Sequence, residues 1–173
     1  DGFIAGKDGD YDWIIMDPAI DFATLFAEFD AAVMGRKTYE VVTRDGHMGM
    51  MSGLQSVVFS HTLAPVETEG LRIVAADPAE VVRQLKAQPG KDIWLYGGGE
   101  LFRTLLAAGL VDTVELAVIP VLLGEGVPLM PPGQRTVLEL CDHKVLPDSG
   151  IVILAYRVAG AAGPAPAIHW VHG

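Results

Sequence analysis

The sequence predicts an α/β fold built on a mostly parallel sheet. Short apolar runs at residues 31–34 and 57–59 are typical of buried strands. Amphipathic segments, such as residues 78–88, lie between such runs, and only strand patterns follow Gly109. Alternating strands and helices form a parallel sheet, and the closing strands then add an antiparallel edge.

The elements follow one another in a regular order. Residues 6–20 contain glycine, proline and aspartate at turn spacing and predict a loop, which the apolar run 13–16 interrupts. Apolar residues at helical spacing predict a helix from Asp21, its N-cap or first-turn acid, to near Asp30. The remaining predictions are strands at 31–34, 57–59, 71–75, 92–96, 112–122, 136–147 and 150–158, helices at 37–44, 78–88 and 100–108, and a loop at 46–53.

The composition indicates a globular chain that binds neither nucleic acid nor membranes. It has 173 residues, 50% of them hydrophobic, and a single cysteine. A chain of this size buries about two thirds of its unfolded surface and needs no disulfide or metal to fold. Its 22 acidic and 12 basic residues give a net charge of −10, which repels phosphate backbones and anionic lipids. With neither a spanning segment nor a secretory leader expected, we predict a cytoplasmic protein.

We expect one domain over residues 1–158 and a flexible tail over 159–173, which is rich in alanine, glycine and proline. The apolar strands within 112–158 leave a sheet edge, so we expect a homodimer through that edge. No metal site is expected, since His169 and His172 lack a cysteine or carboxylate partner. Cys141 is expected to be a half-buried thiol.

Three predicted strands end in residues that suit an anion. They are Gly35-Arg36-Lys37-Thr38, Ser60-His61-Thr62 and Gly97-Gly98-Gly99-Glu100. Ligands of open α/β sheets bind outside the carboxyl ends of the strands. Two of the groups also open helices, where free backbone N–H groups and the helix dipole favour negative charge. The sequence therefore predicts a phosphate-binding edge, although the glycines match neither the dinucleotide fingerprint nor a P-loop.

These motifs also carry a family resemblance. Residues 34–40, the 60–62 strand end and residues 96–102 resemble dihydrofolate reductase, and residues 1–5 and 119–126 resemble the reductase domain of the bacterial riboflavin-biosynthesis deaminase-reductase. The resemblance covers roughly residues 1–158. It implies a dihydrofolate reductase-like three-layer α/β/α fold with a mixed, mostly parallel central sheet and an antiparallel C-terminal hairpin.

The resemblance further implies an NADPH-dependent oxidoreductase. Residues 35–38 and 97–100 would surround the pyrophosphate, and Ser60, His61 and Arg36 would meet the 2′-phosphate. Thr62 would also belong to the cofactor site. The substrate would be a pteridine- or pyrimidine-like heterocycle, reduced as by dihydrofolate reductase or 5-amino-6-(5-phosphoribosylamino)uracil reductase. The alternative is a non-catalytic nucleotide- or ligand-binding protein on the same scaffold.

The resemblance places the substrate side in the first residues of the chain. The loop 6–20 would close over the nicotinamide, with Trp13 as a lid contact and Asp1 near the substrate. Asp21 would be the proton donor, with Asp17 or Glu28 as less favoured candidates. In the families resembled, an apolar strand precedes Asp-Gly-Phe-Ile-Ala, and residues 167–171 are one candidate to occupy that place.

Overall fold

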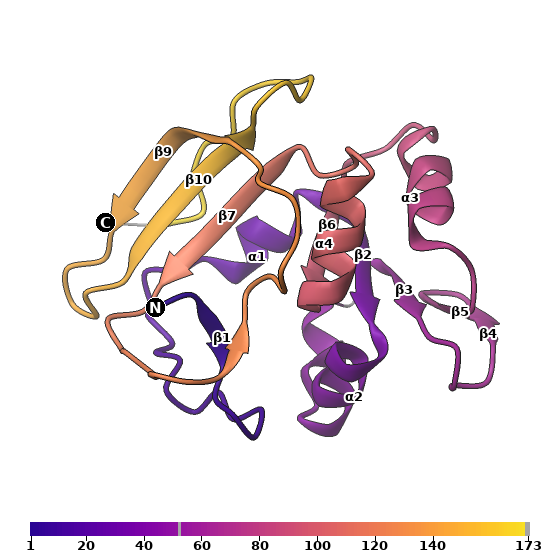
Figure 1. Cartoon of the computed structure of the whole chain (residues 1–173), viewed down its shortest axis with the longest axis horizontal. Helices are drawn as coiled ribbons and strands as arrows, with labels where there is room; N and C mark the ends of the chain where they lie inside the picture. Colours follow the sequence, from indigo (N-terminus) through magenta and orange to yellow (C-terminus); the bar gives the residue numbers. More distant parts are fainter. Residues whose placement is uncertain (52, 172–173) are drawn as a thin grey trace. The chain divides into compact units, whose positions relative to one another are not determined.

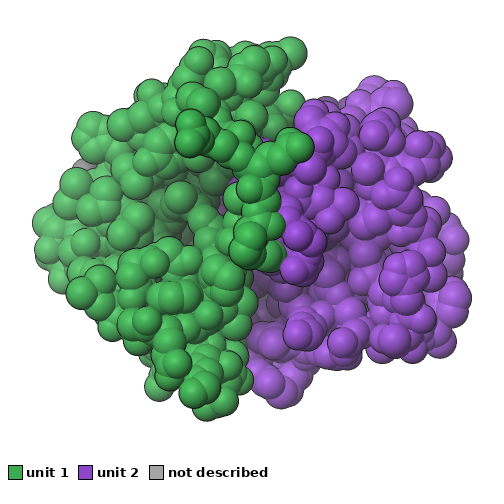
Figure 2. Space-filling model, viewed as in Figure 1, with its two compact units in different colours: residues 1–22, 111–173 green, residues 23–110 purple. Residues whose placement is uncertain are grey.

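The computed structural model describes residues 1–51 and 53–171 (Figure 1). The chain divides into two compact units, each of which is described by itself (Figure 2). Unit 1 comprises residues 1–22 and 111–173, and unit 2 comprises residues 23–110. Within the described residues, no helix is long and apolar enough to cross a membrane.

Unit 2 contains a five-stranded sheet in the order β4-β5-β3-β2-β6. The β2–β3, β2–β6 and β3–β5 pairs are parallel, and β4 runs antiparallel to β5 at the edge. The mixed, mostly parallel sheet predicted from the sequence is thereby confirmed. The strands span β2 (Phe29–Gly35), β3 (Gln55–Phe59), β4 (Val66–Thr68), β5 (Leu71–Val74) and β6 (Asp92–Gly97).

Helices cover both faces of this sheet. Helix α2 (Arg36–Arg44) connects β2 to β3, and helix α3 (Pro78–Lys86) connects β5 to β6. The two connections run in opposite directions along the strand order. Because such crossovers are right-handed, α2 and α3 lie on opposite faces of the sheet. Helix α4 (Gly99–Ala107) packs against α3. Residues 31–34 of β2 are all buried because both faces are covered, which explains their uninterrupted apolar run. Unit 2 therefore has the predicted three layers.

Unit 1 is built from antiparallel strands. Strand β10 (Val152–Val158) pairs with β7 (Thr113–Val118) on one side and with β9 (Leu138–Val145) on the other. The β9–β10 pair is the predicted C-terminal hairpin. A separate pair joins β1 (Phe3–Ala5) to β8 (Val127–Pro128), two strands that are not among those predicted from the sequence.

Two predicted elements near the start of unit 2 differ from the structure. Helix α1 covers only Phe22–Phe26, and the expected helical residue Phe29 begins β2, where its ring stacks on Trp94 at 5.4 Å. Sheet pairing and this aromatic contact outweigh the local helical spacing. The expected loop at 46–53 contains a 3₁₀ helix, η1 (His47–Met51), and Met51 is buried in the core. Ser52 lies outside the described residues.

The end of the described C-terminal segment is packed, whereas residues 160–167 are mostly exposed. Ile168 and Trp170 are 3% and 6% exposed. The Ile168 N–H donates to Asp142 Oδ2 at 2.9 Å, and the Asp21 N–H donates to the Trp170 carbonyl at 2.8 Å. Val171 forms an isolated bridge with Ile20 and joins none of the sheets, so the prediction that residues 167–171 replace a sheet strand is wrong.

Candidate functional site

The three predicted strand ends meet at one edge of the unit 2 sheet. Strands β2, β3 and β6 are adjacent and parallel, so their carboxyl ends point the same way. The register pairs Gly35 with Phe59 and Met34 with Gly97. The residues that follow each strand therefore emerge at the same level, which confirms the geometry that the sequence predicted for this edge.

The helices of unit 2 differ in how their first turns are capped. Asp77 caps α3, and its side chain accepts a hydrogen bond from the Ala79 N–H at 3.0 Å. Helices α2 and α4 instead begin after Gly35 and Gly98, and within the described residues neither has a side-chain cap. Backbone N–H groups in the first turn of a helix have no intrahelical acceptor. Helices α2 and α4 therefore present these donors, with the positive end of the helix dipole, at the sheet edge.

The two glycine caps lie close together. A β-carbon on Gly98 would lie 3.8 Å from the Gly35 nitrogen and 3.6 Å from Thr38 Oγ1. A β-carbon on Gly97 would lie 3.4 Å from Thr38 Cγ2. Gly98 also has φ +100°, a conformation that side chains other than glycine rarely adopt. A β-carbon on Gly35 would meet no atom within 4 Å, so the backbone at Gly35 is open to a ligand.

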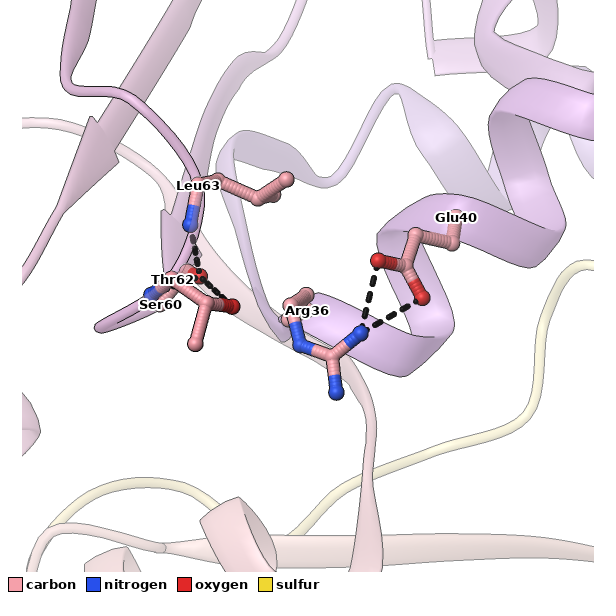
Figure 3. A network of polar contacts seen from close by, with 5 residues as sticks. All are labelled: Arg36, Glu40, Ser60, Thr62 and Leu63. Carbon is pink, nitrogen blue, oxygen red and sulfur yellow. Dashed lines mark hydrogen bonds and ion pairs between the residues drawn. The ribbon is translucent and has the colours of Figure 1, made fainter.

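The first turn of α2 carries two basic side chains with different surroundings. The Arg36 guanidinium donates from one nitrogen to both carboxylate oxygens of Glu40, at 2.7 and 2.9 Å (Figure 3). Lys37 is exposed and, in the part of the chain that the structure describes, has no ion-pair partner. Glu40 partly neutralises the local positive charge that the sequence predicts. The Arg-x-x-x-Glu spacing was the signal that could have indicated this pair.

The turn after β3 is organised by Ser60. Its hydroxyl is buried and accepts hydrogen bonds from the N–H groups of Thr62 at 3.2 Å and Leu63 at 3.0 Å (Figure 3). The Ser60 hydroxyl also lies 3.4 Å from Thr62 Oγ1, and either hydroxyl can donate in this contact (Figure 3). His61 and Thr62 are exposed beside it. Ser60 thus shapes the turn, and its neighbours provide the accessible side chains.

The residues around the glycine turn of β6 and α4 are held by their own partners. Tyr96, which precedes Gly97, contacts Trp94 edge-on at 4.8 Å, and burial raises the pKa of its phenol. Glu100 in the first turn of α4 forms an ion pair with Arg103 on the next turn. Tyr96 therefore stays neutral at physiological pH, and the Glu100 charge is compensated within its own helix.

Of the predicted substrate-side residues, Asp1, Trp13, Asp17 and Asp21 lie in unit 1 and Glu28 lies in unit 2. The Gly124 N–H donates to Asp1 Oδ2 at 2.8 Å. A β-carbon on Gly126 would lie 2.2 Å from the Ala5 carbonyl oxygen, so only glycine fits there. Two segments carry the resemblance to the riboflavin-biosynthesis reductase domain, residues 1–5 and residues 119–126. These two segments are therefore in direct contact.

The candidate proton donors have distinct environments. Asp21 is half-buried, directly precedes α1, and is fixed through its backbone to Trp170. Asp17 is buried, and hydrogen bonds from the Ser149 side chain and the Ala19 N–H lower the pKa of its carboxyl. A lowered pKa favours the ionised form, so Asp17 is a poor proton donor. Trp13 is half-buried in the loop, and its indole N–H reaches the Asp10 carbonyl at 3.3 Å.

A metal centre is not formed by the described part of the chain. No group of three or more histidine, cysteine, aspartate or glutamate side chains lies in a metal-binding arrangement among the described residues. The His169 ring nitrogen lies 3.1 Å from the Ala167 carbonyl oxygen, and His172 lies outside the described residues. Cys141 is a half-buried free thiol, as expected from the sequence.

The three-layer α/β architecture of unit 2 defines the general class of the protein, and comparison with known proteins gives its family. The chain belongs to the RibD C-terminal domain family, whose model matches residues 1–153. It is 35% identical over 172 residues to the uncharacterized protein YyaP of Bacillus subtilis (strain 168), covering 92% of this chain and 90% of that protein.

Solved structures show the same fold. A putative riboflavin biosynthesis protein from Shewanella sp. PV-4 is 26% identical with a TM-score of 0.78, covering 91% of this chain and 93% of that one. A diaminohydroxyphosphoribosylaminopyrimidine deaminase/5-amino-6-(5-phosphoribosylamino)uracil reductase from Thermotoga maritima is 14% identical with a TM-score of 0.65. The match covers 91% of this chain and 53% of that one. The dihydrofolate reductase-like architecture is thereby confirmed.

Proposed function

We propose that this protein is an NADPH-dependent oxidoreductase that reduces a pteridine- or pyrimidine-like heterocycle. The observation that carries the proposal is the meeting of two helix N-termini without side-chain caps at Gly35 and Gly98. Two sets of backbone donors directed at one place suit the two phosphates of a pyrophosphate. Membership of the RibD C-terminal domain family and similarity to a putative riboflavin biosynthesis protein support the same activity.

The chain's own residues fit this cofactor. The N–H groups of residues 35–38 and 97–100 would hold the pyrophosphate, and the open backbone at Gly35 allows close approach. Arg36, with His61 and Thr62 of the Ser60 turn, would hold the 2′-phosphate that distinguishes NADPH from NADH. When bound, the cofactor supplies a hydride to the substrate.

Unit 1 residues would serve the substrate in this proposal. Asp21 would donate the proton that accompanies hydride transfer, because the lowered pKa of Asp17 disfavours Asp17 in that role. Trp13 and the loop around it would exclude water from the reacting atoms. Asp1 would contact the substrate from the segment that Gly124 holds in place.

A second candidate is a nucleotide-binding protein without catalysis. It is favoured by one observation: residues 13–30 contain neither arginine nor lysine, so this segment cannot neutralise a substrate phosphate. The same absence favours an unphosphorylated heterocycle if the protein is an enzyme. The two candidates share the NADPH site and differ only in whether hydride leaves it.

A turnover assay separates them. The protein is incubated with NADPH and either dihydrofolate or the aminopyrimidine of riboflavin biosynthesis, and the loss of reduced nicotinamide absorbance is followed. The proposal expects oxidation of NADPH that depends on one of these substrates and falls at least about tenfold in Asp21→Asn. If the protein binds NADPH tightly but oxidises it with none of the reducible pterins and pyrimidines tried, the non-catalytic alternative is established.

A further inference from the structure

We call residues 168–171 the C-terminal strap, a segment beyond residue 153, where the match to the family model ends. Two of its side chains, those of Ile168 and Trp170, are 3% and 6% exposed. The Ile168 N–H donates to Asp142 Oδ2 at 2.9 Å, which fixes the start of the strap to β9. Buried apolar side chains and a hydrogen bond to a charged acceptor therefore anchor a segment that the family match does not include.

The strap runs beside the residues that lead into α1. The Asp21 N–H donates to the Trp170 carbonyl at 2.8 Å, and Val171 forms an antiparallel bridge with Ile20. Asp21 directly precedes Phe22, the first residue of α1. This helix covers five residues, and a helix so short has little stability of its own. The backbone at Asp21 therefore depends on the strap more than on the helix that follows it.

Asp17 fixes the same stretch of chain from its other end. Its side chain is buried, accepts from the Ala19 N–H at 2.8 Å, and accepts a hydrogen bond from the Ser149 side chain in the turn between β9 and β10. By contrast, residues 14–16 just before it are each at least 40% exposed. The fixed part of the chain therefore begins at Asp17, and Asp21 is held while the loop before it stays open to solvent.

We propose that the C-terminal strap is a positioning segment for Asp21. The inference rests on the proposed function, in which Asp21 donates the proton that accompanies hydride transfer. Proton transfer requires the donor to be within hydrogen-bond reach of its acceptor, and a displacement of about 1 Å lowers a rate about 100-fold. The strap acts through Asp21, because it restrains the backbone that carries the carboxyl group.

Trp170 contributes to this restraint through its carbonyl and its packing. Its indole Nε1 is buried and has no hydrogen-bond partner among the described residues. A buried donor without a partner costs free energy, so the indole N–H adds nothing to the anchor. Trp170→Phe keeps an aromatic side chain and loses this donor, and it should retain at least about a third of kcat. Trp170→Ala loses the packing and should lower kcat at least about tenfold.

Ile168→Ala and Ile73→Ala form a matched pair for the test. Ile168 anchors the strap, whereas Ile73, which is 5% exposed, lies in β5 in the core of unit 2. Both substitutions remove the same atoms from buried positions, so they should lower stability similarly. With dihydrofolate or the aminopyrimidine as substrate, Ile168→Ala should lower kcat at least about tenfold and change the NADPH dissociation constant by less than about twofold. Ile73→Ala should change both by less than about twofold at a temperature where circular dichroism shows both variants to be folded.

Hydrogen exchange of the Asp21 amide, followed by NMR, gives a readout that needs no turnover. In Ile168→Ala this amide should exchange at least about tenfold faster than in Ile73→Ala, because only the first substitution opens the strap locally. If the unmodified protein binds NADPH but oxidises it with neither substrate, the proposed function fails, and faster exchange in Ile168→Ala alone still supports the restraint by the strap. Equal exchange rates in the two variants, or equal kcat losses in an active protein, would overturn the inference.

Discussion

The Gly35 nitrogen lies 3.8 Å from the position that a β-carbon on Gly98 would occupy, which brings the starts of α2 and α4 together. Both helices begin without a side-chain cap within the described residues, whereas Asp77 caps α3. The chain therefore leaves backbone donors free at the helix starts that converge. This relationship underlies the proposed cofactor site.

Replacing Gly98 should affect both folding and binding. Alanine at φ +100° is strained, and we expect Gly98→Ala to lower the free energy of unfolding by about 1–3 kcal/mol. The displaced turn should also weaken NADPH binding at least about tenfold, since the N–H groups would no longer be directed at the pyrophosphate. Urea unfolding and fluorescence titration with NADPH measure the two effects.

Gly109→Ala is the matched control for that variant. Gly109 also has a positive φ of +67°, and its β-carbon would meet nothing within 4 Å. It should lose about 1 kcal/mol of stability and keep its NADPH affinity. Equal affinity losses in the two variants would mean that the binding effect is only a consequence of lower stability.

The Arg36–Glu40 pair should tune cofactor choice. Arg36→Ala should weaken NADPH binding by about 5–30-fold and NADH binding far less, because the 2′-phosphate loses a charged donor. Glu40→Gln should strengthen NADPH binding about two- to threefold by releasing Arg36. Arg83→Ala on α3, where Arg83 pairs with Glu80, is the control and should change neither affinity. An unchanged ratio of NADPH to NADH affinity in Arg36→Ala would remove Arg36 from the site.

The parallel sheet was predictable because its pattern is local. Residues 31–34 form an uninterrupted apolar run that ends in glycine, and a helix pattern follows. The positions of Gly35, Ser60 and Gly97 at strand ends followed directly, and the register confirms that they share one edge. What the sequence could not show was distance, such as the approach of Gly98 to Thr38.

The errors arose where long-range contacts decide local structure. Phe29 has helical spacing but packs on Trp94, 65 positions later in the sequence. The tail has a linker composition, yet Ile168 and Trp170 are buried. Their backbones form hydrogen bonds with Asp142 and Asp21, which are distant in sequence. A β-bulge at Cys141 in β9 has no sequence signal of its own, and it reverses the faces of the residues before it. The single-domain boundary at 158 stays a prediction.

Trp170 should contribute strongly to stability. Its side chain is 6% exposed, so Trp170→Ala should cost about 3–5 kcal/mol. For a chain of this size, that corresponds to a melting temperature lower by about 6–20 °C. The substitution His169→Ala, at the neighbouring exposed position, should change the free energy of unfolding by no more than about 0.5 kcal/mol.

Deletion of residues 160–173 should also lower the melting temperature markedly. An unchanged melting temperature would show that the tail does not contribute to the fold.

Asp142 should make the protein sensitive to acid. The Ile168 N–H, and then the His143 N–H, lower the pKa of its carboxyl below the unfolded value. A lowered folded pKa stabilises the protein above the unfolded pKa of about 3.9, and this stabilisation is lost as the pH falls through the folded pKa. Asp142→Asn should therefore melt at a lower temperature at neutral pH and lose less on acidification. Melting curves from pH 7 to pH 3 test this, with the exposed Asp148→Asn expected to follow the unmodified protein.

Calorimetric titration of the full chain with NADPH and with NADH tests the proposed cofactor site. We expect one NADPH per chain, bound at least about tenfold more tightly than NADH because the 2′-phosphate adds a charged contact. Gly98→Ala should weaken both nucleotides, since both carry the pyrophosphate. No heat of binding with either nucleotide at millimolar concentration, or equal affinities for the two, would show that this protein has no NADPH site of the proposed kind.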